Sequence, residues 1–293
     1  MQKLEWPTLA LLAGTYLLWV VAICVLPGIT LWLAVPVLAL AIAQHSSLQH
    51  EALHGHPFRS QTLNTAMVFP ALGLVIPYLR FRDTHLAHHR DSELTDPYDD
   101  PESNYLDGGD WDRLSWIAQT ILTWNNTLLG RMALGPLIGT VVFLRSEWAR
   151  APNDPAVMRG WLWHFAMVLP VLTVVFLSPI PFWAYGVACH LALSLLRIRT
   201  YLEHQAHERV RGRSVIIEDR GPLALLFLNN NLHVVHHMHP RVPWFRLPRL
   251  FRANRARYLQ INEGYAYRSY AEVFRRHALT PKDPVPHPLW RRD

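Results

Sequence analysis

The longest uncharged apolar segment constrains the fold of this chain more than any other feature. Residues 8–26 contain no charged side chain over 19 positions, enough for a helix to cross a bilayer. The segment is longer than the apolar region of a usual signal peptide and lacks a small-residue cleavage site, so we expect a retained span. Pro27 and Gly28 then predict a tight turn, and residues 29–48 predict a second span.

A second apolar hairpin follows later in the chain. Residues 160–177 and 180–198 are apolar and are joined by Ser178 and Pro179. Neither hairpin tip carries a charge, and 17 of the 28 Lys and Arg lie from Arg199 onward. The positive-inside rule places such residues in the cytoplasm. We therefore expect an integral, multi-pass membrane protein whose two termini and polar parts, residues 49–159 and 199–293, lie on the cytoplasmic side.

Two weaker apolar stretches, 65–79 and 132–144, are short and interrupted by Pro and Gly. Runs of this length more often lie in the membrane interface than cross it. The sequence thus predicts one all-α membrane domain over residues 1–293. It has four transmembrane helices arranged as two hairpins, interfacial helices, and a cytoplasmic helical cap.

The composition agrees with a few membrane helices that carry a large polar portion. Hydrophobic residues make up 51% of the chain and charged residues only 17%, while the mean hydropathy is +0.06. Two cysteines cannot form a disulfide framework or a cysteine-based metal site. The net charge of +6 is explained by attraction to anionic lipid headgroups, so we expect no nucleic-acid partner.

The 17 histidines are clustered rather than scattered. The sequences HLAHH (85–89) and HVVHH (233–237) place three imidazoles on one helical face, and HEALH (50–54) places two imidazoles one turn apart. Imidazole is a ligand for iron, zinc, copper and nickel. The clusters comprise more histidines than one ion can bind, which favours two ions sharing a site; the residues are His50, His54, His85, His88, His89, His233, His236 and His237.

These three sequences resemble the histidine boxes of the membrane fatty acid desaturase and hydroxylase family. Asp96-Pro97 and the segment HPRVPWFRLP (239–248) are also similar to that family. The resemblance implies a non-haem centre of two iron ions, with dioxygen as co-substrate. Its ligands would be the eight box histidines and His204, which lies in RTYLEHQAH (199–207).

Other polar residues lie beside these clusters. Glu51, Asp96 and Glu203 can orient a metal-bound imidazole through its second ring nitrogen, with a solvated surface role as the alternative. His207 can act in the same way or as a ligand. His239 flanks the third box and is expected to donate a hydrogen bond to the site.

Two other classes of function compete with the resemblance. HEALH also matches H-E-x-x-H, in which two histidines hold zinc and Glu51 would be the general base of an intramembrane protease. That interpretation leaves both H-x-x-H-H clusters unexplained. A metal carrier or sensor is the non-enzymatic alternative.

The resemblance implies an oxidoreductase that acts on an unactivated C–H bond of a lipid or acyl chain. A fatty acid desaturase is the first expectation, and a hydroxylase or ketolase of a lipid, hydrocarbon or carotenoid is the alternative. The chain has no cytochrome b5-like H-P-G-G segment. Electrons are therefore expected from a separate ferredoxin, rubredoxin, or cytochrome with its reductase.

Overall fold

The structure is a computed structural model that describes residues 4–91 and 93–290. Nearly all regular elements in these residues are helices. The strands described are β1 (Ile216–Ile217) and β2 (Ala266–Tyr267), which pair in parallel. The predicted all-α membrane class is confirmed.

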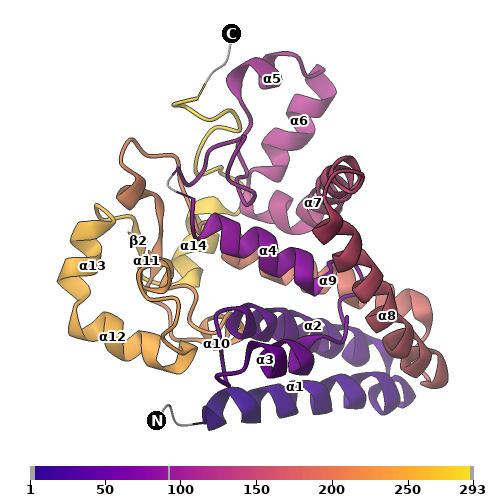
Figure 1. Cartoon of the computed structure of the whole chain (residues 1–293). Helices are drawn as coiled ribbons and strands as arrows, with labels where there is room; N and C mark the ends of the chain where they lie inside the picture. The colour runs from indigo at the N-terminus through magenta and orange to yellow at the C-terminus, as the bar shows by residue number, and fades with distance from the viewer. Residues whose placement is uncertain (1–3, 92, 291–293) are drawn as a thin grey trace. The chain divides into compact units, whose positions relative to one another are not determined.

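The chain divides into two compact units, whose elements are labelled in Figure 1. Unit 1 comprises Met1–Arg82 and Leu137–Leu196, and unit 2 comprises Asp83–Pro136 and Arg197–Asp293. Each is described below by itself. The boundaries fall within three helices, so a single domain over 1–293 stays a prediction; these helices are α4 (Tyr78–His88), α7 (Leu128–Arg150) and α9 (Phe182–Thr200).

The first predicted hairpin forms the start of unit 1. Helix α1 (Trp6–Cys24) and helix α2 (Leu31–Leu53) pack side by side, joined by the short helix η1 (Leu26–Gly28) (Figure 1). Thr30 caps α2, because its hydroxyl accepts a hydrogen bond from the backbone N–H of Trp32 at 3.3 Å. Helix α2 continues past the expected span, so its last turn carries a histidine box.

Within the described residues, four helices are long and apolar enough to cross a membrane. They are Trp6–Gly28, Leu31–Leu53, Leu128–Arg150 and Pro155–Leu177. The first, second and last correspond to the predicted spans 8–26, 29–48 and 160–177. Leu128–Arg150 is α7, whereas the sequence predicted residues 180–198 as the fourth span.

This difference has a compositional cause. The segment 132–144, predicted to lie in the interface, is the centre of a helix that continues through Pro136 and over Arg131 and Arg145. Helix α9 contains residues 182–198 and follows α8 (Pro155–Leu177) through the expected turn. Helix α9 is not among the four candidate membrane spans, because Arg197 and Arg199 in its last turn lower its mean hydropathy.

The segment 65–79 does not form a long helix. Helix α3 (Gln61–Val68) ends early in it, and irregular backbone follows until α4 begins at Tyr78. Polar side chains from the apolar helices satisfy this backbone: the hydroxyl of Tyr185 donates to the carbonyl of Leu72 at 2.8 Å. Such partners are required where non-helical backbone is buried in a membrane protein.

A buried ion pair fixes the start of α4 within unit 1. The guanidinium of Arg80 donates to both carboxylate oxygens of Glu147, at 2.7 and 3.0 Å, and both side chains are almost fully buried. The indole of Trp161 donates to the same carboxylate at 3.1 Å. Gly160 lies against Arg80, so close that an added Cβ would come within 2.7 Å of its side chain.

Unit 2 contains shorter helices packed around a core of its own. The core residues are Ile216, Leu232, Val234, Val235, Leu247, Phe251 and Tyr258. The helices are α5 (Gly108–Asp112), α6 (Trp116–Asn125), α10 (Pro222–Leu226), α11 (His233–Met238), α12 (Leu247–Ala253), α13 (Arg255–Ile261) and α14 (Tyr270–His277), with short helices η2 (Val210–Arg213) and η3 (Trp244–Arg246).

The six-residue helix α11 connects this core to the histidines. Val234 and Val235 pack into the core. At about 100° per residue, the positions before and after them lie on the opposite face, which places three imidazoles together there. The start of α11 is tied to β1, since the N–H of Val234 donates to the carbonyl of Val215 and the N–H of Ile217 to that of Asn231.

Candidate metal centre

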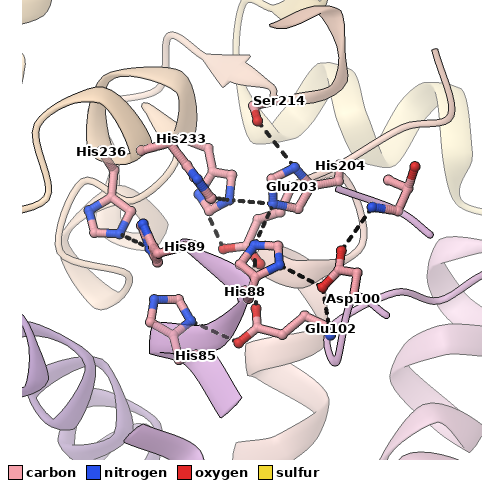
Figure 2. A network of polar contacts seen from close by, with 12 residues as sticks. His85, His88, His89, Asp100, Glu102, Glu203, His204, Ser214, His233 and His236 are labelled. Carbon is pink, nitrogen blue, oxygen red and sulfur yellow. Dashed lines mark hydrogen bonds and ion pairs between the residues drawn. The ribbon is translucent and has the colours of Figure 1, made fainter. Parts of the chain in front are cut away.

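Seven of the nine predicted ligands come together in unit 2. Helix α4 and the residue after it provide His85, His88 and His89, and α11 provides the third box. His204 comes from the loop between α9 and η2. Figure 2 shows imidazoles from segments far apart in sequence pointing toward one another; those labelled are His85, His88, His89, His204, His233 and His236.

Four of the imidazoles form one group: His88, His204, His233 and His237 each offer a ring nitrogen, and these atoms all lie within 4.8 Å of one another. The Nε2 atom of His204 is 3.0 Å from that of His88 and 3.0 Å from that of His233. The Nε2 atom of His237 is 3.1 Å from that of His233. The inner ring nitrogens therefore converge on one point.

The outer ring nitrogens contact polar groups that fix the tautomers. Nδ1 of His88 lies 2.7 Å from a carboxylate oxygen of Asp100 (Figure 2). Nδ1 of His233 lies 3.2 Å from the amide oxygen of Asn230, whose nitrogen donates to Glu203 at 3.0 Å. With these partners both imidazoles donate a proton from Nδ1, so each ring presents an Nε2 lone pair inward when it is neutral.

Converging lone pairs make this arrangement suitable for a cation. Neutral imidazole nitrogens about 3 Å apart with no proton between them repel one another, whereas a metal ion among them would accept every lone pair. An all-imidazole set suits iron, zinc, copper or nickel rather than calcium or magnesium. The residues of this group fit a transition-metal ion.

A second group of ligands lies beside the first in unit 2. The ligand atoms of His85, His89 and His236 are mutually within 4.8 Å, and Nε2 of His236 is 3.1 Å from Nε2 of His89. The ring of His89 stacks on that of His237 with centroids 4.2 Å apart. Nδ1 of His85 is 2.8 Å from Glu102, again leaving the inner nitrogen for a metal (Figure 2). Two adjacent groups favour two ions.

His50 and His54 belong to unit 1. His50 lies in the last turn of α2 and His54 is its C-terminal cap; their rings are 4.9 Å apart. The first box is therefore formed as expected within its own unit. Its participation in the centre of unit 2 stays a prediction.

The loop of His204 is held by backbone contacts. The N–H of Gln205 donates to the carbonyl of Arg213 at 2.8 Å, and His204 pairs with Ser214 in an antiparallel bridge. The hydroxyl of Ser214 lies 3.1 Å from Nδ1 of His204, and the ammonium group of Lys282 donates to the carbonyl of His204. An irregular segment thereby positions its imidazole.

The protonation equilibria favour neutral imidazoles at the centre. Burial, followed by repulsion from neighbouring histidines, holds the pKa values of His204, His233 and His237 well below the usual range. Burial together with His85 and His88 lowers the pKa of His89 to about 3. Neutral imidazole is the form that binds metal.

Carboxylates near the centre raise the pKa of one predicted ligand, His88, instead of lowering it. Burial lowers the pKa of His88, but Glu102 and Asp100 outweigh it and raise that pKa to about 9. Burial raises the pKa of Glu102, whereas His85 and His88 hold it well below its usual range. Glu102 is therefore ionised and adds negative charge beside a cation.

The sequence did not single out the residues that orient the ligands most directly. Asp100, Glu102, Asn230 and Ser214 contact ring nitrogens, and none of them was predicted. Glu203 was predicted and reaches His233 through Asn230. The acidic run DPYDDPE (96–102), which follows the second box in the chain, was the sequence signal that could have identified Asp100 and Glu102.

The side chains of three other residues predicted to orient ligands, Asp96, His207 and His239, contact groups outside the ligand set. A carboxylate oxygen of Asp96 accepts from the N–H of Tyr98, and His207 lies 3.6 Å from Glu263. The ring of His239 packs edge-on to Tyr258. Glu51 lies in unit 1, in the same helical turn as His50.

The chain is similar to known proteins over most of its length. Residues 27–270 match the sequence model of the family described as Fatty acid desaturase. The chain is 26% identical over 234 residues to a beta-carotene ketolase of Paracoccus sp. (strain N81106 / MBIC 01143) and 27% identical over 233 residues to a beta-carotene ketolase of Paracoccus sp. (strain PC1). Each alignment covers 78% of both proteins.

Proposed function

Because this chain belongs to the fatty acid desaturase family, and is thus a membrane oxidoreductase of the desaturase and hydroxylase type, we propose that it oxidises an unactivated C–H bond of a lipid with dioxygen. The convergence of imidazole lone pairs in unit 2 is the observation that carries this proposal. We propose the nine predicted histidines as ligands of two iron ions, with His50 and His54 joining the group of His85, His89 and His236.

Iron with dioxygen supplies the oxidising power that such a bond requires and that acidic or basic side chains lack. The protein residues hold and orient the ligands. Asp100 and Glu102 keep a proton on the outer nitrogens of His88 and His85, and Asn230 does so for His233. The electron donor is a separate ferredoxin, rubredoxin or cytochrome, and the site faces the cytoplasm.

Desaturation of an acyl chain is the first candidate reaction. It follows the family resemblance of the three boxes and the family match over residues 27–270. The expected product is a fatty acid with one additional double bond in the membrane lipids of a host that expresses the protein.

Ketolation of a carotenoid is a second candidate, because both relatives described above are beta-carotene ketolases aligned over most of their length. The expected product in this case is a carotenoid carrying a new carbonyl group. A keto group in conjugation with the polyene shifts its absorption to longer wavelength.

One experiment separates these candidates. A bacterial host that accumulates β-carotene would express the wild type or His88→Ala, and both fatty acids and carotenoids would be analysed by mass spectrometry. A new double bond in the acyl chains supports desaturation, and a keto-carotenoid supports ketolation; either product should be absent with His88→Ala. If neither lipid class changes in cells that contain iron-loaded wild-type protein and a suitable electron donor, both candidates are wrong.

A further inference from the structure

A third cluster of metal-ligating side chains lies in unit 1, and none of its members is one of the nine predicted histidine ligands. Glu5, Glu51 and His56 are 6%, 6% and 1% exposed, and one ligand atom from each lies within 4.8 Å of the others. Glu5 precedes α1, Glu51 lies in the last turn of α2, and His56 follows α2 in the chain. The cluster therefore joins the start of the first helix to the end of the second.

Only some of the potential ligand atoms of Glu5 and His56 are used in contacts within the cluster. One carboxylate oxygen of Glu5 is 2.8 Å from Nδ1 of His56. Within residues 4–91 and 93–290, the other oxygen of Glu5 and Nε2 of His56 are buried and have no hydrogen-bond partner. Glu5 stands at the N-cap position of α1, yet its side chain makes no capping hydrogen bond. A buried polar atom without a partner requires an explanation, and a bound ion is one.

The net charge of the cluster also favours a bound cation. Two carboxylates and one imidazole carry a net negative charge among themselves even when the imidazole is protonated. A divalent cation bound among these groups would compensate that charge where water is excluded. A proton shared between Glu5 and His56 would account for the contact at 2.8 Å, but it would leave the second oxygen of Glu5 without a partner.

We propose that Glu5, Glu51 and His56 bind one divalent transition-metal ion at a site separate from the histidine centre. Two carboxylate oxygens with one imidazole nitrogen suit Mn²⁺, Fe²⁺ or Zn²⁺. Ligand bonds of about 2.0–2.2 Å keep two ligand atoms within about 4.4 Å of each other, so side-chain movements of a few tenths of an ångström close the site. The bound ion ties the chain before α1 to the helix that carries His50 and His54.

Metal content per chain tests this site. The full-length protein in detergent would be stripped with a chelator, reloaded with Mn²⁺, desalted and analysed by elemental mass spectrometry. Glu5→Gln should bind one ion fewer per chain than the wild type, because an amide is a poor replacement for a carboxylate ligand. The matched control Glu208→Gln, at an exposed glutamate of unit 2, should bind as many ions as the wild type.

The difference between variants is the readout, so it does not depend on how many ions the histidine centre takes. His88→Ala should lower the metal content as well, and the losses in Glu5→Gln and His88→Ala should add in the double variant. If the histidine centre binds no metal, only the loss in Glu5→Gln remains, and the proposed function fails while this site stands.

Thermal unfolding provides a second measurement. In the His88→Ala background, Mn²⁺ should raise the unfolding temperature, and adding Glu5→Gln should abolish that increase. His56→Gln serves as a second variant if Glu5→Gln does not fold, since it keeps a polar side chain of similar size. Equal metal content in the wild type and in whichever of these variants folds would overturn the proposal and leave a hydrogen-bonded Glu5–His56 pair.

Discussion

Single carboxylates decide which nitrogen a histidine offers to a metal at this centre. Asp100 illustrates this: it is buried, lies 2.7 Å from Nδ1 of His88, and also accepts from the N–H groups of Thr95 and Glu102. Its contacts fix the imidazole and the loop after the second box together. Residues of this kind tune metal affinity without touching the metal.

Replacing Asp100 should therefore weaken the centre. Asp100→Asn keeps the shape of the side chain but removes the charge that holds the Nδ1 proton of His88, and we expect a roughly 10- to 100-fold loss of metal affinity or activity. Metal titration followed by elemental analysis measures the effect. Asp99→Asn changes the exposed neighbour and should bind like the wild type; equal affinities for all three proteins would contradict the assignment.

His204 and His207 provide a matched pair for testing which histidine of the segment 199–207 is a ligand. Nε2 of His204 lies 3.0 Å from two other imidazole nitrogens, whereas His207 is partly exposed and near Glu263. His204→Ala should lower the iron content and abolish activity, and His207→Ala should keep both. If His207→Ala lost iron and His204→Ala kept it, His207 and not His204 would be the ligand.

The sequence singled out these histidines because their spacing carries the information, and their role as ligands stays a prediction. Three residues between His50 and His54, and two between His233 and His236, place imidazoles on one helical face whatever surrounds the helix. Asp100 and Glu102 could not be chosen in advance, because their contacts depend on how an irregular loop folds back on α4. Asp96 and His207 were selected by proximity in sequence, which does not determine contact in such segments.

At the scale of elements, α7 shows where sequence reasoning reached its limit. The short apolar run 132–144, interrupted by Pro and Gly, suggested an interfacial segment, yet the helix runs from Leu128 to Arg150. A proline is tolerated in such a helix when neighbouring groups satisfy the freed backbone. Both α7 and α9 are long helices, and it is their mean hydropathy that makes α7 and not α9 a candidate membrane span.

The contact of α8 with α4 gives a stability prediction. Gly160→Ala would place a methyl group 2.7 Å from the side chain of Arg80, which cannot move without breaking its pair with Glu147. We expect a loss of about 1–3 kcal/mol from overpacking. In Gly186→Ala, where nothing lies within 4 Å of the added carbon, we expect a gain of about 0.5–1 kcal/mol. Thermal unfolding in detergent measures both, and shifts of equal sign would refute the argument.

At the scale of the whole molecule, membrane orientation follows from charge. The uncharged tip of the first hairpin and the basic residues after Arg199 predict that both termini face the cytoplasm. This orientation was inferred from the distribution of Lys and Arg and requires an even number of crossings. It is the property that a topology experiment tests most directly.

Reporter fusions check this orientation. Alkaline phosphatase fused after Asp293 should be inactive and green fluorescent protein at the same position should fluoresce, because the C-terminus is expected in the cytoplasm. Phosphatase fused after Gly28, at the tip of the first hairpin, should be active and serves as the internal control. An active fusion after Asp293 would mean an odd number of crossings.

The short helix α11 has a consequence for how the protein matures. Its three histidines are the last of the proposed ligands that the ribosome adds. A nascent chain that already carries its first hairpin and second box still lacks the donors that close the four-imidazole group. The four-imidazole group can therefore take up a metal ion only after the ribosome has passed His237.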